Sequence, residues 1–89
     1  MRQELTNRAE RMRTVLEAAF SPLELEITDE SHLHHGHAGA APGGETHYAV
    51  RIRAAAFEGL TRLAIHRAIN DALADEFRSG LHALSIAAV

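Results

Sequence analysis

The chain has 89 residues, enough for one domain, and 46% of them are hydrophobic and 24% charged, a balance typical of a folded globular protein. It contains no cysteine, so it carries no disulfide, no thiolate nucleophile and no thiolate metal ligand of its own. Nine Arg and no Lys stand against twelve Asp and Glu, and the net charge of −3 gives no general attraction to nucleic-acid phosphates.

The first predicted element is an amphipathic helix over residues 2–20, because apolar side chains recur there at every third or fourth position. Ser21 and Pro22 end it, since proline lacks the backbone N–H and disfavours helical backbone in the residue before it. Residues 23–28 then alternate strictly, which predicts a half-buried strand. One face of that strand would carry Leu23, Leu25 and Ile27.

Residues 29–44 differ in kind, because they hold four of the seven histidines, four glycines and one proline, with almost no large apolar side chain. The composition predicts a long loop, and loops beyond about 12 to 15 residues in a compact domain are often functional. Alternation resumes over residues 45–53, which predicts a second strand that forms a long-looped hairpin with the first. One of its faces would carry Tyr48, Val50 and Ile52.

Thr61 is the predicted N-cap of a helix that runs through Phe77 and ends at Gly80. Its apolar side would consist of Leu63, Ile65, Ala68, Ile69, Ala72, Leu73, Ala74 and Phe77. Residues 81–89 form a last strand, which a right-handed crossover would place parallel to the second. We therefore expect an α/β (α+β) fold of order α-β-β-α-β, with helices on one face of a three-stranded mixed sheet. Residues 1–89 would form a single domain.

The sequence also lacks the segments that address a chain to a membrane or to export. No apolar run approaches the roughly 18 residues that span a bilayer. The Arg- and Glu-rich N-terminal segment has no apolar h-region of a signal peptide. We expect no membrane partner and a cytoplasmic location.

Histidine is the residue type that points to chemistry. His32, His34, His35 and His37 lie in glycine-rich backbone that would let their rings converge, and neutral imidazole is a common ligand of zinc, copper and iron. The alternative is a polar, solvated loop in which these histidines have no role. A lone histidine such as His82, in an otherwise apolar strand, is by itself more typical of a structural residue that hydrogen-bonds its neighbours.

Nothing in the sequence indicates an enzyme. No serine stands in a strand-turn-helix elbow, and the carboxylates show no helical pair spacing tied to a cleft. The loop glycines are followed by neither a phosphate-binding Lys nor a helix start. The arginines at 51, 53, 62 and 67 are typical of a solvated surface.

Several short motifs in fixed order together resemble the BolA family. They are Glu30-Ser31-His32, Gly36-His37-Ala38-Gly39, Gly44-Glu45-Thr46-His47-Tyr48, Phe57-Glu58-Gly59, His66-Arg67, Glu76-Phe77 and Gly80-Leu81-His82-Ala83-Leu84-Ser85. The resemblance runs from residue 30 to residue 85. It implies a fold similar to class II KH domains, in agreement with the α-β-β-α-β order.

The resemblance also implies a partner, a monothiol glutaredoxin that forms a heterodimer with the BolA chain and shares a 2Fe-2S cluster with it. The glutaredoxin Cys and glutathione supply sulfur, while the BolA chain supplies one His from its last-strand motif and one His or Cys from its loop. The motif makes His82 the first ligand. Counting from Glu30-Ser31 favours His34 as the second, and counting back from the motif at residues 44–47 favours His37. The isolated chain would hold no cluster and would be a monomer or a weak homodimer.

Two alternatives remain open at this point. The KH-like fold also fits a DNA-binding transcriptional regulator, but KH domains clamp nucleic acid with a Gly-x-x-Gly turn that residues 57–62 lack. The family commonly has Arg-His-Arg where this chain has Ile65-His66-Arg67, which removes one positive charge. A metal buffer formed by the histidine loop alone would instead bind metal without any partner.

Overall fold

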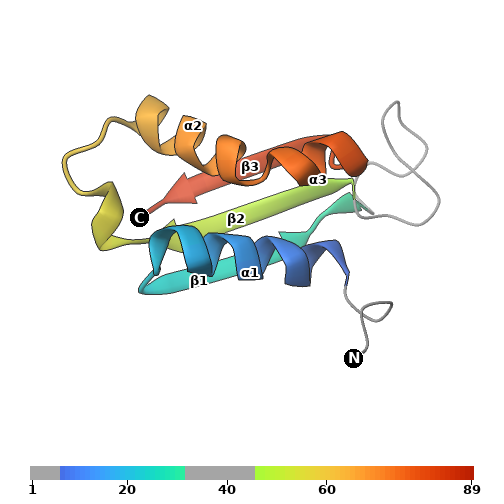
Figure 1. The fold of residues 1–89 in the computed structure, drawn as a ribbon, viewed down its shortest axis with the longest axis horizontal. Coiled ribbons are helices and arrows are strands. Elements are labelled where there is room, and N and C mark those ends of the chain that lie inside the picture. The colour runs from blue at the N-terminus through green and yellow to red at the C-terminus, as the bar shows by residue number, and fades with distance from the viewer. Residues whose placement is uncertain (1–6, 32–45) are drawn as a thin grey trace.

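The computed structural model describes residues 7–31 and 46–89 and confirms the predicted order of elements (Figure 1). The elements are α1 (Arg8–Phe20), β1 (Glu24–Asp29), β2 (His47–Arg53), the short 3-10 helix η3 (Ala55–Phe57), α2 (Arg62–Ala72), α3 (Ala74–Ser79) and β3 (Ala83–Ala88). The strand order is β1-β2-β3, with β1 antiparallel and β3 parallel to β2. The helices lie together over one face of this sheet, as predicted (Figure 1).

The hydrophobic core lies between the sheet and the helix layer. The alternation in β2 predicted one apolar face, and Tyr48, Val50 and Ile52 are all buried there. The edge strands contribute less, because Leu25 and Ile27 of β1 are only half-buried against this core. The helices add Met12, Leu16, Ile65, Ile69 and Leu73.

Side-chain caps fix where the two long helices begin. The Asn7 side-chain oxygen accepts a hydrogen bond from the Glu10 N–H at 2.9 Å, so α1 begins at Arg8. The predicted start at Arg2 lies outside the described residues. The Thr61 hydroxyl accepts from the Ala64 N–H at 3.0 Å, which confirms Thr61 as the N-cap of α2.

The prediction of a single helix from Thr61 to Phe77 is wrong, because the helical segment is divided at Leu73 into α2 and α3. Leu73 leaves helical backbone at φ −99° and ψ 17°, while its side chain remains 1% exposed. The apolar pattern continues across this residue, so periodicity alone could not reveal the break.

The prediction that two leucine side chains lie on the buried, apolar faces is also wrong. Leu23 precedes β1 and is 68% exposed, and Leu63 is 58% exposed on the solvent side of α2. Several strand boundaries shift by one or two residues. Among them, Asp29, predicted as the first loop residue, is the last residue of β1, and His82, predicted inside the last strand, precedes β3. The shift at β3 places His82 in the connection that leads from α3 into the sheet.

Candidate metal centre at one end of the sheet

His82 lies at the end of the sheet where β1 finishes and where β2 and β3 start (Figure 1). Its backbone N–H donates to the Thr46 carbonyl oxygen at 2.8 Å, and the Ala83 N–H donates to the same oxygen at 3.1 Å. The His82 side chain is exposed. The residue therefore combines a fixed backbone with a ring that solvent or a partner can reach.

The ring of His47, the first residue of β2, lies beside the ring of His82. The two ring centroids are 5.2 Å apart, and the ring planes are tilted by 52°. His47 is buried, and its Nδ1 lies 2.9 Å from the Thr46 hydroxyl oxygen, which fixes the orientation of the ring. Sequence reasoning gave His47 no role, although it stands in one of the motifs that carried the family resemblance.

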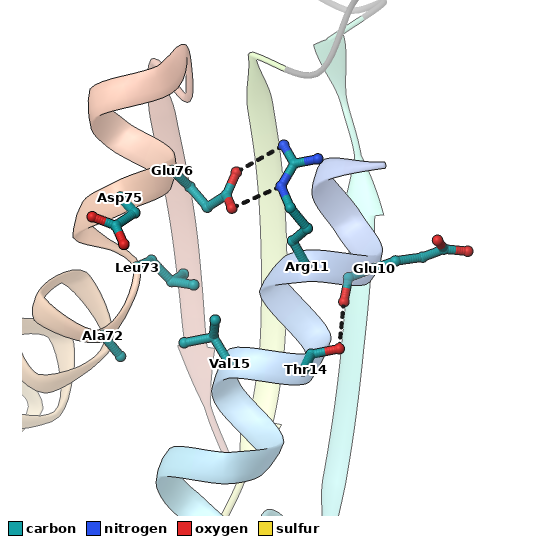
Figure 2. Close-up of a pocket in the computed structure, with 8 residues that line it drawn as sticks. All are labelled: Glu10, Arg11, Thr14, Val15, Ala72, Leu73, Asp75 and Glu76. Carbon is teal, nitrogen blue, oxygen red and sulfur yellow. Dashed lines mark hydrogen bonds and ion pairs between the residues drawn. The ribbon is translucent and has the colours of Figure 1, made fainter. Parts of the chain in front are cut away.

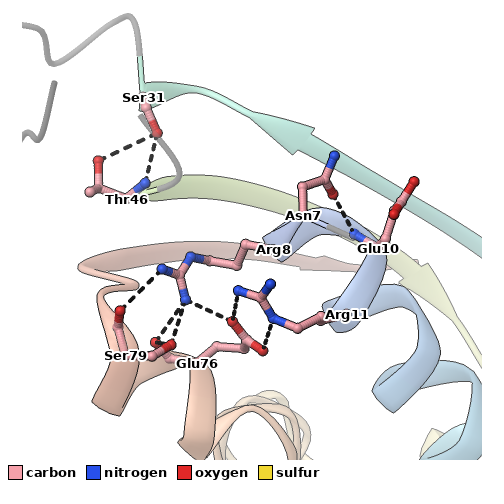
Figure 3. Close-up of polar contacts among 8 residues, drawn as sticks. All are labelled: Asn7, Arg8, Glu10, Arg11, Ser31, Thr46, Glu76 and Ser79. Carbon is pink, nitrogen blue, oxygen red and sulfur yellow. Dashed lines mark hydrogen bonds and ion pairs between the residues drawn. The ribbon is translucent and has the colours of Figure 1, made fainter. Parts of the chain in front are cut away.

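A buried hydroxyl joins the two described residues that flank residues 32–45. The Ser31 Oγ accepts a hydrogen bond from the Thr46 N–H at 2.9 Å (Figure 3). It also accepts one from the His47 N–H at 3.1 Å. The Ser31 N–H in turn donates to Asp29 Oδ1 at 2.8 Å. Because Thr46 also accepts from the His82 N–H, Ser31 and His82 are both hydrogen-bonded to the same residue. The predicted loop therefore leaves and rejoins the described chain close to His82.

The other predicted ligands, His34 and His37, lie outside the described residues, as do His32 and His35. Within residues 7–31 and 46–89, no group of three or more His, Asp or Glu side chains could hold a metal ion. A metal at His82 would thus need donors from outside the described residues, such as residues 32–45, or from another molecule. His66 is not close to this centre: it lines a cavity with Ile86 and Ala87, near the opposite end of β3.

A buried ion-pair network lies under the same end of the sheet (Figure 3). Glu76 of α3 accepts from Arg8 Nη1 at 2.7 Å through Oε1 and from Arg11 Nε at 3.0 Å through Oε2. The side-chain hydrogen bond from Arg11 and the charges of both arginines hold the pKa of Glu76 below its ordinary value of 4.5, although burial acts in the opposite direction. Sequence reasoning missed this pairing, because Arg8 and Glu76 are distant in the chain and on different helices.

A cavity of about 440 Å³ lies between α1 and the α2–α3 junction, with the Arg11–Glu76 pair on its wall (Figure 2). It is lined by Glu10, Arg11, Thr14, Val15, Ala72, Leu73, Asp75 and Glu76. His82 does not line it. The cavity is therefore separate from the candidate metal centre.

As for membranes, no helix among the residues that the structure describes is both long and apolar enough to cross a bilayer.

The fold and the site define a small α+β protein with an exposed histidine at one end of its mixed sheet, close to Ser31 and Thr46, which flank the histidine-rich residues 32–45. A family model described as "BolA-like protein" matches residues 16–89. The chain belongs to this family, which confirms the resemblance found in its motifs.

Solved structures of relatives share the fold. The BolA domain of SufE1 from Arabidopsis thaliana is 48% identical, with a TM-score of 0.84 over 94% of this chain and 92% of that one. BolA1 from the same plant is 43% identical, with a TM-score of 0.83 over the same shares.

The human BolA-like protein 1 is 47% identical over 77 residues, which cover 86% of this chain. This chain spans 53% of that human protein and 24% of the full SufE-like protein 1 of Arabidopsis.

Proposed function

We propose that the protein is a non-enzymatic adaptor that pairs with a monothiol glutaredoxin and shares a 2Fe-2S cluster with it, acting in iron-sulfur cluster trafficking or iron regulation. His82 is one ligand, and His37 or His34 is the second. The glutaredoxin Cys and a glutathione thiolate supply the sulfur ligands. The observation that carries the proposal is the exposed ring of His82 on a backbone held by Thr46 and beside the ring of His47.

The donors of this chain fit such a role. It has no cysteine, so its own contribution to a cluster is imidazole nitrogen, which iron accepts. Replacing thiolates by imidazoles lowers the negative charge around a cluster and raises its potential. The ring of His82 is exposed, as a ligand shared with a partner has to be. Because only neutral imidazole binds a metal, ligation through histidine should weaken in acid.

The surrounding residues support His82 in this role. His47 packs against its ring, and the Thr46 carbonyl anchors its backbone, so the ligand is held by contacts beyond the metal itself. Such outer contacts orient metal-bound histidines and strengthen binding. The Ser31–Thr46 hydrogen bond fixes both flanks of residues 32–45, the segment that contains both candidates for the second ligand.

The rival function is DNA binding, for which the described surface offers little. Arg51 and Arg53 lie 3.5 and 3.7 Å from the Glu24 carboxylate, whose single negative charge offsets part of their charge on the open face of the sheet. Phosphate contact depends on uncompensated cations and is strongly weakened by salt. A gel shift at physiological ionic strength should therefore show negligible affinity, and a steeply salt-dependent complex would favour the regulator instead.

The proposal is tested by mixing the free protein with a cluster-loaded monothiol glutaredoxin and glutathione. We expect a one-to-one heterodimer in size-exclusion chromatography with light scattering, together with a changed visible circular dichroism spectrum. His82→Ala should shorten the cluster half-life about tenfold or more, the usual scale for losing metal-site contacts. His66→Ala, a histidine variant near the other end of β3, is the control and should change nothing.

No heterodimer and an unchanged spectrum would contradict the proposal. Tight metal uptake by the free chain that survives His82→Ala would instead support the metal buffer. The expected cytoplasmic location belongs to the same proposal and is tested by cell fractionation. Two Arabidopsis relatives are named as a chloroplastic protein and as a chloroplastic and mitochondrial protein.

A further inference from the structure

The turn that leads into His82 is held by one side chain of α1, that of Arg8 (Figure 3). Arg8 Nη1 donates to the Glu76 carbonyl oxygen at 3.2 Å and to Ser79 Oγ at 2.9 Å, and Nη2 donates to the Ser79 carbonyl oxygen at 3.3 Å. Both carbonyls belong to the last turn of α3. The Glu76 carbonyl also accepts from the Gly80 N–H, while the Ser79 carbonyl is one of the last carbonyls of the helix, which have no helical N–H to accept from. The Arg8 guanidinium therefore caps the C-terminus of α3.

The Glu76 carboxylate holds this guanidinium in place. Its Oε1 lies 2.7 Å from Arg8 Nη1, and both side chains are buried. A planar guanidinium presents several donors in a fixed fork, so one ion pair can orient it toward two carbonyls at once. Arg11 binds the same carboxylate from the next turn of α1. The cap is thus a rigid unit that joins α1 to α3.

Gly80 allows the guanidinium to approach the backbone this closely. It has a φ of +135°, and a Cβ at this position would lie 2.9 Å from Arg8 Nη2. The next residue, Leu81, is buried, and its N–H donates to the Glu76 carbonyl oxygen at 2.9 Å, the same oxygen that Arg8 binds. The His82 N–H then donates to Thr46. The backbone on both sides of the histidine is therefore fixed.

We propose that Arg8 is a positioning residue for the cluster: through Glu76, Ser79 and Gly80 it fixes the turn that presents His82. This inference rests on the proposed ligand role of His82. Arg8 lies outside residues 16–89, the part matched by the family model. The ligand geometry of this chain thus depends on a residue in the first turn of α1.

The test is Arg8→Lys, which retains the positive charge for Glu76 but lacks the fork that reaches the two carbonyls. In the isolated chain, we expect lower 15N heteronuclear NOE values for the amides of Gly80, Leu81 and His82. In the glutaredoxin heterodimer, the cluster half-life should fall about tenfold, while the heterodimer still forms. Arg13→Lys, an exposed change on the same helix, is the matched control and should leave both readouts unchanged.

Far-UV circular dichroism first checks that Arg8→Lys is folded. Ser79→Ala is the milder second variant, because it removes only the hydroxyl that Arg8 binds from an exposed residue. It should shift both readouts in the same direction by a smaller amount, which keeps the inference testable should Arg8→Lys fail to fold.

The experiments distinguish a failure of the positioning role of Arg8 from a failure of the proposed ligand role of His82. Unchanged amide NOE values and cluster half-life in folded Arg8→Lys, with His82→Ala still destabilising the cluster, would overturn the positioning role alone. A His82→Ala variant with an unchanged cluster half-life would overturn the proposed ligand and the inference that depends on it. Lower NOE values together with a shorter half-life, absent in Arg13→Lys, would support both.

Discussion

Among the described residues, two clusters each have one glutamate between two arginines, and the glutamate is buried in only one of them. Glu76 lies 2.7 Å from Arg8 and 3.0 Å from Arg11. The side chains of Glu76 and Arg8 are each 9% exposed, and that of Arg11 is 41% exposed. Glu24 lies 3.5 Å from Arg51 and 3.7 Å from Arg53, with all three side chains between 43% and 54% exposed. The two clusters consist of the same residue types, but Glu76 and Arg8 are shielded from water and Glu24 is not.

The difference shows what burial adds to an ion pair. Around Glu24, water already solvates the charges, so the pairing stabilises little and mainly links neighbouring strands. Around Glu76, loss of one partner would leave a charge stranded away from water, which is costly. The buried cluster also joins the start of α1 to the end of α3, directly before His82. The same residue types therefore lie on the exposed face of the sheet in the Glu24 cluster and hold the turn before His82 in the Glu76 cluster.

The largest expected effect comes from breaking the buried cluster. Glu76→Gln keeps the shape of the side chain but leaves Arg8 buried without its counter-charge, which should cost about 3 kcal/mol of unfolding free energy. Urea denaturation monitored by circular dichroism measures it. A loss below about 1 kcal/mol would mean that water or another group replaces the carboxylate, and the buried cluster would then behave like an exposed one.

The second-largest expected loss of stability comes from a substitution of Gly80, which lies against the Arg8 guanidinium. Gly80→Ala should cost about 2 kcal/mol, because the added Cβ is strained at φ +135° and also meets Arg8 Nη2 at 2.9 Å. Gly59→Ala is the matched control: φ is +83°, but nothing lies within 4 Å of the added Cβ. We expect it to cost about 1 kcal/mol, from backbone strain alone. Equal costs in urea denaturation would show that the guanidinium moves aside without penalty.

The buried Glu76 carboxylate should also make the stability of the chain depend on pH. The pKa of Glu76 is lower in the folded chain than its ordinary value of 4.5, because of its hydrogen bond with Arg11 and the charges of both arginines. Its stabilising contribution is therefore complete above pH 4.5 and is lost as the pH falls through the folded-state pKa. The stability gap between the wild type and Glu76→Gln should narrow over that acid range. A gap that stays constant down to pH 2.5 would contradict this assignment.

The smallest expected effect comes from the exposed cluster. Glu24→Gln should change the unfolding free energy by about 0 to 1 kcal/mol, and added salt should abolish the difference. The measurement is urea denaturation at low and at high salt. A loss as large as that of Glu76→Gln would remove the contrast between the two clusters.

The sequence predicted most of the fold because periodicity and capping are local. Thr61 marked the start of α2, and the alternation of β2 marked its buried face. The break at Leu73 escaped prediction because its side chain continues the apolar pattern while its backbone leaves the helix. Leu23 and Leu63 were misplaced because alternation and helical spacing do not show where the core ends.

The candidate site could be predicted only in part. The motif pointed to His82, but the exposure of this residue and its contact with His47 depend on strand pairing, which a linear pattern does not display. The Arg8–Glu76 pair joins residues near opposite ends of the chain, so no local signal connects them. His34 and His37 remain predictions, because both lie outside the described residues.

The most direct test of the central claim is whether an imidazole nitrogen of His82 binds iron in the heterodimer. Pulsed EPR of the reduced cluster, with 15N-histidine incorporated only in this chain, detects nitrogen bound to iron. We predict strong 15N coupling in the wild type and in His66→Ala, with one histidine coupling lost in His82→Ala. Identical coupling in His82→Ala, or none in the wild type, would contradict the account.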